Sequence, residues 1–95
     1  MMAVVLPIQY FNLGPNVGKS YYENLAGGIN AAVTVNNNSA NPVSLVITRV
    51  NAPVITYEIP AFNSLTLAVH LLLVAALLTG AGAAFGTIEI TSAEF

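Results

Sequence analysis

The ionisable residues of this chain are too few and too scattered to suggest catalysis. The single histidine, His70, would need a carboxylate partner such as Glu58 or Glu89 for acid-base chemistry. One histidine at the polar end of a strand is typical of an ordinary surface residue. Lys19 and Glu23 lie close together in the sequence, but Lys19 has the character of a solubilising charge beside a turn. We therefore expect no catalytic residue and no enzymatic activity.

Cofactor and metal sites are not indicated either. The chain contains no cysteine, which excludes a disulfide framework, a zinc-thiolate cluster and a thiol nucleophile. Gly80 and Gly82 are not followed by the lysine of a phosphate-binding loop. The four tyrosines have no tryptophan beside them, and this favours packing over carbohydrate stacking. We expect no cofactor, no metal and no small-molecule substrate.

The low charge of the chain is its most informative property. Two basic and four acidic residues make up 6% of 95 residues, whereas about 25% is usual for a globular domain. Lys19 and Arg49 are too few to neutralise a row of phosphates, so we expect no nucleic-acid partner. A formal net charge of -2 gives little protection against association. We therefore expect much of the surface to be covered, by further copies of the chain or by lipid.

Apolar and polar residues alternate with the period of two that is typical of half-buried strands. Turns rich in Asn, Pro and Gly separate the alternating segments. Short strands at this spacing predict an all-β fold, an antiparallel jelly roll or β-sandwich. The alternating segments are residues 31–36, 43–50, 54–59, 65–70 and 87–91.

Residues 71–78 break the alternation because they are apolar throughout. Such a run indicates a strand buried on both faces or a helix. A membrane span needs about 20 mostly apolar residues, and a span near residues 61–85 would include several polar ones. We favour a strand buried in the core or in a subunit contact, and do not expect a membrane partner. The predicted lateral interface residues are Leu71, Leu73 and Leu77.

The first residues form an extended apolar segment whose proline confines it to a sheet edge. Three units are predicted: a connector strand at residues 1–12, a flexible spacer at residues 13–26 and a β-sandwich at residues 27–95. A first strand of the same sandwich, followed by a long loop, is the alternative. No secretory signal is expected, because the start has no positively charged region. The predicted connector interface is Val4, Leu6, Ile8 and Tyr10, and the predicted hinge is Gly14, Pro15 and Gly18.

The order of these elements resembles the jelly-roll subunits of bacterial endospore appendages, which are pilus-like fibres. The likeness covers residues 27–95, and is carried by the strand segments at 31–36, 43–49, 63–67 and 86–91. The resemblance implies a subunit located on a spore or cell surface. Members of that family use cysteines in the connector and body to cross-link neighbours. Since this chain has none, the resemblance is to a cysteine-free variant without covalent links.

The expected function is that of a structural subunit which self-assembles without covalent bonds into an extracellular fibre. The connector would add to a neighbouring subunit by β-augmentation. Donor and acceptor surfaces differ, so the contact is heterologous and generates an open helical filament. The expected partner is the chain itself. The alternatives are a structural protein of a viral or phage particle, and a small membrane protein spanning near residues 61–85.

Overall fold

Seven antiparallel β-strands make up the fold, which a computed structural model describes for residues 3–23 and 27–92. The prediction of an all-β fold is confirmed, and the described residues contain no helix. The run at 71–78 belongs to a strand, so the helical alternative for it is wrong. The strands are β1 (Ala3–Leu13), β2 (Gly18–Glu23), β3 (Ile29–Asn37), β4 (Val43–Arg49), β5 (Ile55–Ile59), β6 (Ser64–Thr79) and β7 (Ala84–Ser92).

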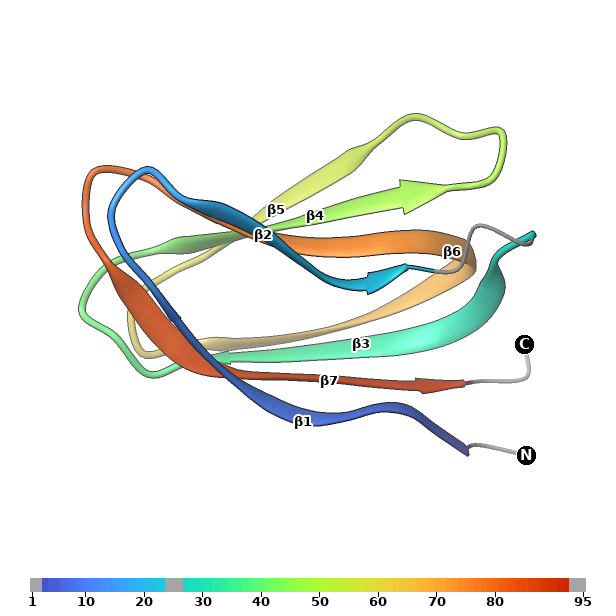
Figure 1. The fold of residues 1–95 in the computed structure, drawn as a ribbon, viewed down its shortest axis with the longest axis horizontal. Helices are drawn as coiled ribbons and strands as arrows, with labels where there is room; N and C mark the ends of the chain where they lie inside the picture. Colours follow the sequence, from blue (N-terminus) through green and yellow to red (C-terminus); the bar gives the residue numbers. More distant parts are fainter. Residues whose placement is uncertain (1–2, 24–26, 93–95) are drawn as a thin grey trace.

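The strands form two layers, and β6 takes part in both of them. Hydrogen bonding follows the order β1-β7-β3-β6-β4-β5, with β2 also paired to β6. The first part of β6 pairs with β3, and its second part pairs with β4 and β2. Leu71 lies where the two parts meet, and its φ of 53° is in the left-handed region. Figure 1 shows β6 turning back on itself at this bend.

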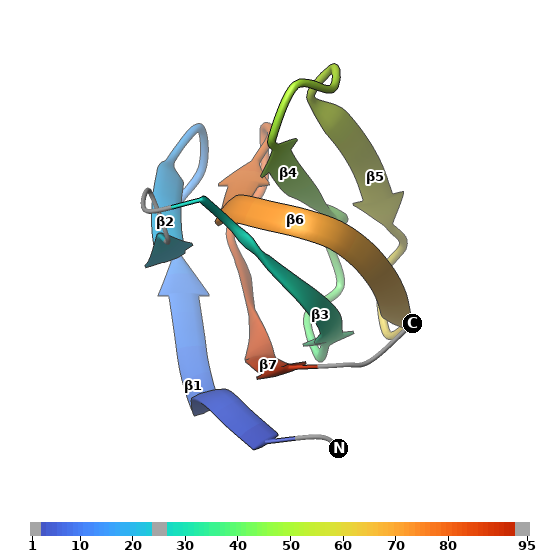
Figure 2. The same cartoon turned by 90° about the vertical axis from the view of Figure 1, so that its right-hand side faces the viewer.

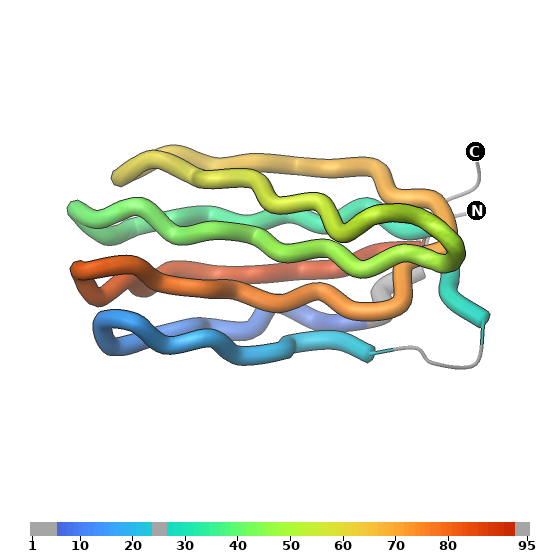
Figure 3. The backbone as a smooth tube through the Cα atoms, turned by 90° about the horizontal axis from the view of Figure 1, so that it is seen from above, coloured from blue at the N-terminus to red at the C-terminus, as the bar shows by residue number. Residues whose placement is uncertain are grey.

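We call the layer of β1, β7, β3 and residues 64–70 sheet I, and the layer of β2, residues 72–79, β4 and β5 sheet II. Viewed from above, the strands of the two sheets lie over one another in pairs (Figure 3). The end-on view shows β1 beside β2 on one side of the sandwich and β5 on the other (Figure 2). The chain thus passes repeatedly between two antiparallel sheets, as in a β-sandwich.

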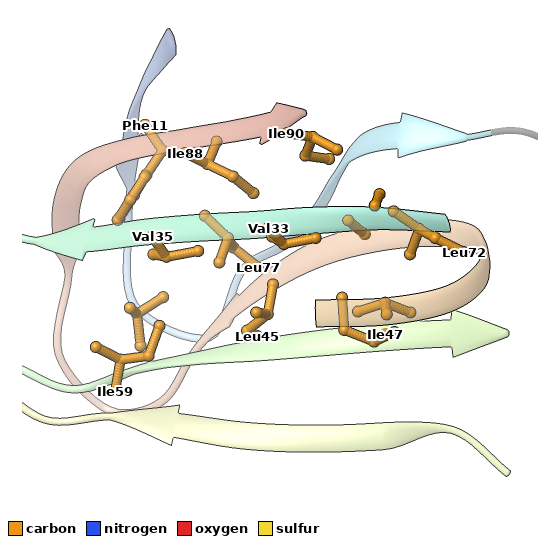
Figure 4. Close-up of a cluster of buried hydrophobic side chains, with 14 of the residues drawn as sticks. Phe11, Val33, Val35, Leu45, Ile47, Ile59, Leu72, Leu77, Ile88 and Ile90 are labelled. Atoms are coloured by element: carbon orange, nitrogen blue, oxygen red, sulfur yellow. The ribbon is translucent and has the colours of Figure 1, made fainter. Parts of the chain in front are cut away.

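Residues that alternate in the sequence fill the space between the sheets. On β3 the alternate residues Ala31, Val33 and Val35 are fully buried. Their counterparts from β4 and the second part of β6 point toward the same interior in Figure 4. This arrangement follows from strand geometry, because each strand turns every second side chain to the same face. The buried partners on the other strands include Val43, Leu45, Ile47, Leu72, Leu77, Ile88 and Ile90.

The predicted division at residue 12 does not match the observed strands. Residues 3–13 form β1, which pairs along its length with β7 of the same chain. Phe11 on β1 is 2% exposed, and its ring lies edge-on to that of Tyr21 on β2, with centroids 6.5 Å apart. The predicted spacer at residues 13–26 contains β2. Within one chain the segment therefore follows the alternative, a first strand of the same sandwich.

Candidate assembly surfaces

Four strand segments have one edge without a partner in the described chain. In sheet I these are β1 and the first part of β6, and in sheet II they are β2 and β5. An edge strand presents backbone N–H and C=O groups on which another strand can pair, and proteins usually protect such edges with charged side chains. The four free edges are therefore candidate surfaces for assembly.

Charge is distributed unequally among these edges. Sheet II carries Lys19 and Glu23 on β2 and Glu58 on β5. The described part of β1 contains no acidic or basic residue, and the free part of β6 contains only His70. The ammonium of Lys19 lies 5.1 Å from the centroid of the Tyr21 ring, which places this charge over the end of β2. The two edges of sheet I thus have little charge to oppose pairing.

On β1, the predicted connector residues do not share one face. Register shifts between Val4 and Leu6 and between Leu6 and Gln9 interrupt the pairing with β7. Leu6 packs against the core, whereas Ile8 is 56% and Tyr10 is 85% exposed. The side chain of Val4 lies outside the described residues. A period of two cannot anticipate a bulge, which moves later side chains to the opposite face.

The outer face of sheet II carries an apolar stripe that the sequence prediction places on other residues. Leu77 is fully buried in the core, so its assignment to a lateral interface is wrong. The neighbouring Leu78 is 45% exposed and pairs with Ser44 on β4. The stripe also includes half-buried residues on β6 and β4. Its members are Val46, Val74, Ala76 and Leu78.

The other two predicted lateral residues lie at the bend rather than along the stripe. Leu71 is 44% exposed, at the point where β6 changes sheets. Leu73 is half-buried beside a register shift between Thr48 and Arg49. The alternation shifts twice here: Leu72 rather than Leu71 is buried at the bend, and the register shift beside Leu73 returns the odd-numbered Ala75 and Leu77 to the core. Residues 71–78 are apolar because one side faces the core and the other forms the stripe.

The predicted hinge forms a corner that is fixed by hydrogen bonds. The hydroxyl of Thr79 donates to the carbonyl of Gly14 at 2.5 Å and accepts the N–H of Val17 at 2.9 Å. The N–H of Asn16 donates to the carbonyl of Gly80 at 2.7 Å. Pro15 lies within this turn, and Gly18 begins β2. The structure thus places Gly14, Pro15 and Gly18 in an anchored corner between the sheets, not in a free spacer.

A buried amide holds the loops at the same end of the sandwich. Asn37 is 1% exposed, and its Nδ2 donates to the carbonyl oxygens of Asn41 at 2.8 Å and Ile59 at 3.2 Å. Its Oδ1 accepts from the N–H and the hydroxyl of Ser39. Because a buried polar group needs partners, this network is selective for asparagine. It joins the β3–β4 loop to the β5–β6 loop.

The structure does not bring a catalytic set together. Glu58 lies in sheet II, while Glu89 lies on β7, which β3 separates from His70 on β6. Among the described residues, no three acidic or histidine side chains form a possible metal site, and no cavity is found. Burial raises the pKa of the Tyr21 hydroxyl. Such a shift is explained by packing against the core and does not require a functional role.

Residues 61–85, where a membrane span was the alternative, form no helix in the structure. Those residues form β6 with its flanking turns and the start of β7. No helix within residues 3–23 and 27–92 is long and apolar enough to cross a membrane.

Comparison with known proteins identifies a similar fold. No protein-family model matches the sequence, and no curated protein matches it significantly. A solved structure described as "Bacillus endospore appendages form a novel family of disulfide-linked pili" matches with a TM-score of 0.64. The match covers 96% of this chain and 87% of that chain, at 14% sequence identity. The likeness shows the fold alone, and it supports the resemblance found in the sequence.

Proposed function

We propose that this protein is a structural subunit that polymerises, without covalent links, into an extracellular pilus-like fibre. The observation that carries the proposal is the pair of free, nearly uncharged edges on opposite sides of sheet I. The fold likeness to an endospore appendage that forms pili supports it. The chain has no cysteine, so disulfides cannot join its copies, in contrast to the disulfide-linked pili of that structure. Location on a spore or cell surface belongs to the same proposal.

Strand direction allows the two edges of sheet I to pair between copies. β1 is antiparallel to β7, β7 to β3, and β3 to β6, so β1 and the first part of β6 run in opposite directions. A copy displaced sideways along the sheet would therefore place its β1 antiparallel to β6 of its neighbour. This is β-augmentation by the N-terminal strand. Because the two surfaces differ, each added copy leaves a new free edge, and growth remains open.

Side chains on β1 add apolar area to this contact. Ile8 and Tyr10 are exposed in the single chain, and burial of each contributes about 1.5–3 kcal/mol. Association costs about 4–15 kcal/mol. These two side chains alone are thus insufficient, and the apolar stripe on sheet II is a further source of contacts between copies. We therefore expect the fibre to be held by several weak contacts, at the edge of β1 and at the apolar stripe.

The test replaces Ile8 with lysine in the full-length chain. A charge on the free edge of β1 should oppose strand pairing, while an exposed position should tolerate the change in the folded monomer. Thr56→Lys is the matched control, because Thr56 is exposed on β5 in sheet II and the change in net charge is the same. We expect filaments from the native chain and from Thr56→Lys in negative-stain electron microscopy, and none from Ile8→Lys.

Circular dichroism of all three chains separates assembly from folding. A β spectrum for Ile8→Lys without filaments supports edge pairing by β1. Abundant filaments from Ile8→Lys would rule out β1 as the assembling edge and leave a fibre possible. Closed shells from the native chain would instead indicate a particle protein, and recovery only in detergent would indicate a membrane protein.

A further inference from the structure

Two bulky apolar residues occupy backbone conformations that normally favour Gly or Asn. Six described residues have positive φ, and four of them are Asn16, Asn51, Gly27 and Gly28. The other two are Phe62, with φ of 58°, and Leu71, with φ of 53°. Both side chains are exposed, Phe62 by 71% and Leu71 by 44%. A need to fill the core does not explain why Phe and Leu occur here, because both are exposed. Backbone preference does not explain it either, because positive φ favours Gly or Asn.

Local hydrogen bonds hold both residues in place. The N–H of Phe62 donates to the carbonyl of Ser39 at 3.1 Å. The N–H of Leu71 donates to Oδ1 of Asn30 at 3.1 Å, and its carbonyl accepts the N–H of Val50 at 3.1 Å. A Cβ at residue 28 would approach the carbonyl atoms of Leu71 to 2.8 Å, so only glycine leaves enough space there for the backbone of Leu71. Strained conformations persist when surrounding contacts determine them, and they concentrate at functional sites.

The two residues lie at opposite ends of the molecule. They flank the free part of β6, and an extended chain from residue 62 to residue 71 spans about 30 Å. The longest dimension of the molecule is 34 Å. In Figure 1 the loop between β5 and β6 lies at one end of the long axis, and the bend in β6 lies at the other. A displacement along this strand would bring Phe62 of one copy to Leu71 of the next.

The end of Phe62 carries no charge among the described residues, and the end of Leu71 carries that of Arg49. At the end of Phe62, the four loops at residues 14–17, 38–42, 60–63 and 80–83 contain no ionisable side chain. At the end of Leu71, residues 50–54 contain none, and Val54 there is 58% exposed. The guanidinium of the adjacent Arg49 is held on this loop, where it donates to the carbonyl of Pro53 at 3.1 Å. Exposed apolar side chains favour contact with a like surface, and at the end of Phe62 no ion must be desolvated.

We propose that Phe62 and Leu71 form a second, end-to-end contact between copies of this chain, with Phe62 of one copy against Leu71 of the next. The proposal rests on the fibre function and adds a direction of growth along the strands, separate from edge pairing by β1. The strained backbone directs each side chain outward at its end. The fibre is then held laterally by sheet edges and axially by these two residues.

Because the natural chain lacks cysteine, cross-linking can test the contact directly. Phe62→Cys and Leu71→Cys are combined in one full-length chain and oxidised after assembly. Their separation of about 30 Å greatly exceeds the Cα distance of about 7 Å that a disulfide tolerates, so bonds form only between copies. We expect a ladder of covalent oligomers on a non-reducing gel. Phe62→Cys combined with Thr56→Cys is the control, and we expect it to give no ladder.

A second pair of variants keeps the backbone and removes the apolar side chain. Phe62→Asn and Leu71→Asn place a residue suited to positive φ at each site. We expect equal or higher thermal stability of the monomer and about a tenfold to hundredfold loss of affinity in polymerisation. A side chain that serves only the fold would change stability without this loss.

The outcomes separate the two proposals. A ladder limited to the Phe62 and Leu71 combination supports the end-to-end contact. Native filaments without a ladder, or full polymerisation of both Asn variants, would overturn it and leave the fibre function standing. If the native chain forms no filaments, the fibre function fails. In that case a disulfide between copies would still support the contact, and its absence would remove both proposals.

Discussion

Sheet I and sheet II differ in what their faces and edges present to solvent. The outer face of sheet I is polar at its centre, with hydroxyls of Thr34 and Thr66 3.1 Å apart and Asn36 donating to Thr87 at 3.1 Å. Its exposed aromatic residues, Tyr10 and Phe85, lie toward β1. Its two free edges carry almost no charge. Sheet II has the reverse arrangement, because its edges carry Lys19, Glu23 and Glu58 and its outer face carries the apolar stripe.

This contrast shows that a low overall charge is not spread evenly over the fold. A polar outer face discourages face-to-face stacking of sheet I, while its bare edges favour pairing with another strand. Charged edges discourage pairing of sheet II, while its apolar stripe favours contact through the face. The two sheets are therefore suited to different contacts between copies. The following predictions test how far the two sheets act separately in the monomer.

The largest loss of stability is expected where β1 of sheet I packs against β2 of sheet II. Phe11→Ala removes a buried ring between β1 and β2 and should lower the free energy of unfolding by about 3–5 kcal/mol. Urea denaturation followed by circular dichroism measures the change. Ile8→Ala is the control on the same strand, because Ile8 is 56% exposed, and it should change stability little. Equal stability of Phe11→Ala and the native chain would mean that β1 is not part of the folded monomer.

The next largest loss of stability is expected on the inner face of sheet II, and little loss on its outer face. Leu77→Ala should cost about 2–5 kcal/mol because it leaves a cavity in the core, since Leu77 is fully buried. Leu78→Ala should change the free energy of unfolding by less than about 0.5 kcal/mol, since Leu78 is 45% exposed. Thermal unfolding of both variants gives the comparison. Similar losses for the two would contradict the observed alternation after the bend.

A smaller effect is expected at the corner that links the sheets. Thr79→Val keeps the shape of the side chain and removes its hydrogen bonds to Gly14 and Val17. Because Gly14 and Val17 are exposed residues, the loss should be that of ordinary hydrogen bonds, about 0.5–1.5 kcal/mol each. Thr48→Val on β4 is a surface control for the same substitution. If both variants unfold at the same denaturant concentration, the corner does not depend on Thr79.

The smallest effect concerns pH. Burial raises the pKa of Tyr21 above its ordinary value of 10.0, so the folded state holds this proton more tightly than the unfolded state. The stability from this group is fully present below about pH 10 and is lost as the pH rises toward the raised value. Denaturation across this alkaline range measures the slope. Tyr21→Phe should reduce that slope, and an unchanged slope would assign it to other tyrosines.

Much of this fold is predictable from local patterns. Alternation with a period of two is a property of each segment, and the segments now seen as β3, β4, β5, the first part of β6 and β7 are all predicted by it. The scarcity of charge and the absence of cysteine are also visible without a structure. They are the basis for expecting no nucleic-acid partner and for directing attention to surfaces that other molecules cover.

The partners of each strand and the direction of each side chain near a bend depend on contacts distant in sequence. Residues 3–13 have the same alternation whether they pair with β7 of their own chain or with a neighbour, so their place in the sandwich appears only in the pairing. The exposure of Leu71 and the burial of Leu72 depend on the bend at Leu71. That bend is held by Asn30 and Val50 from other strands and loops. A short-range period cannot contain this information, because hydrogen bonds between remote segments set where the alternation shifts.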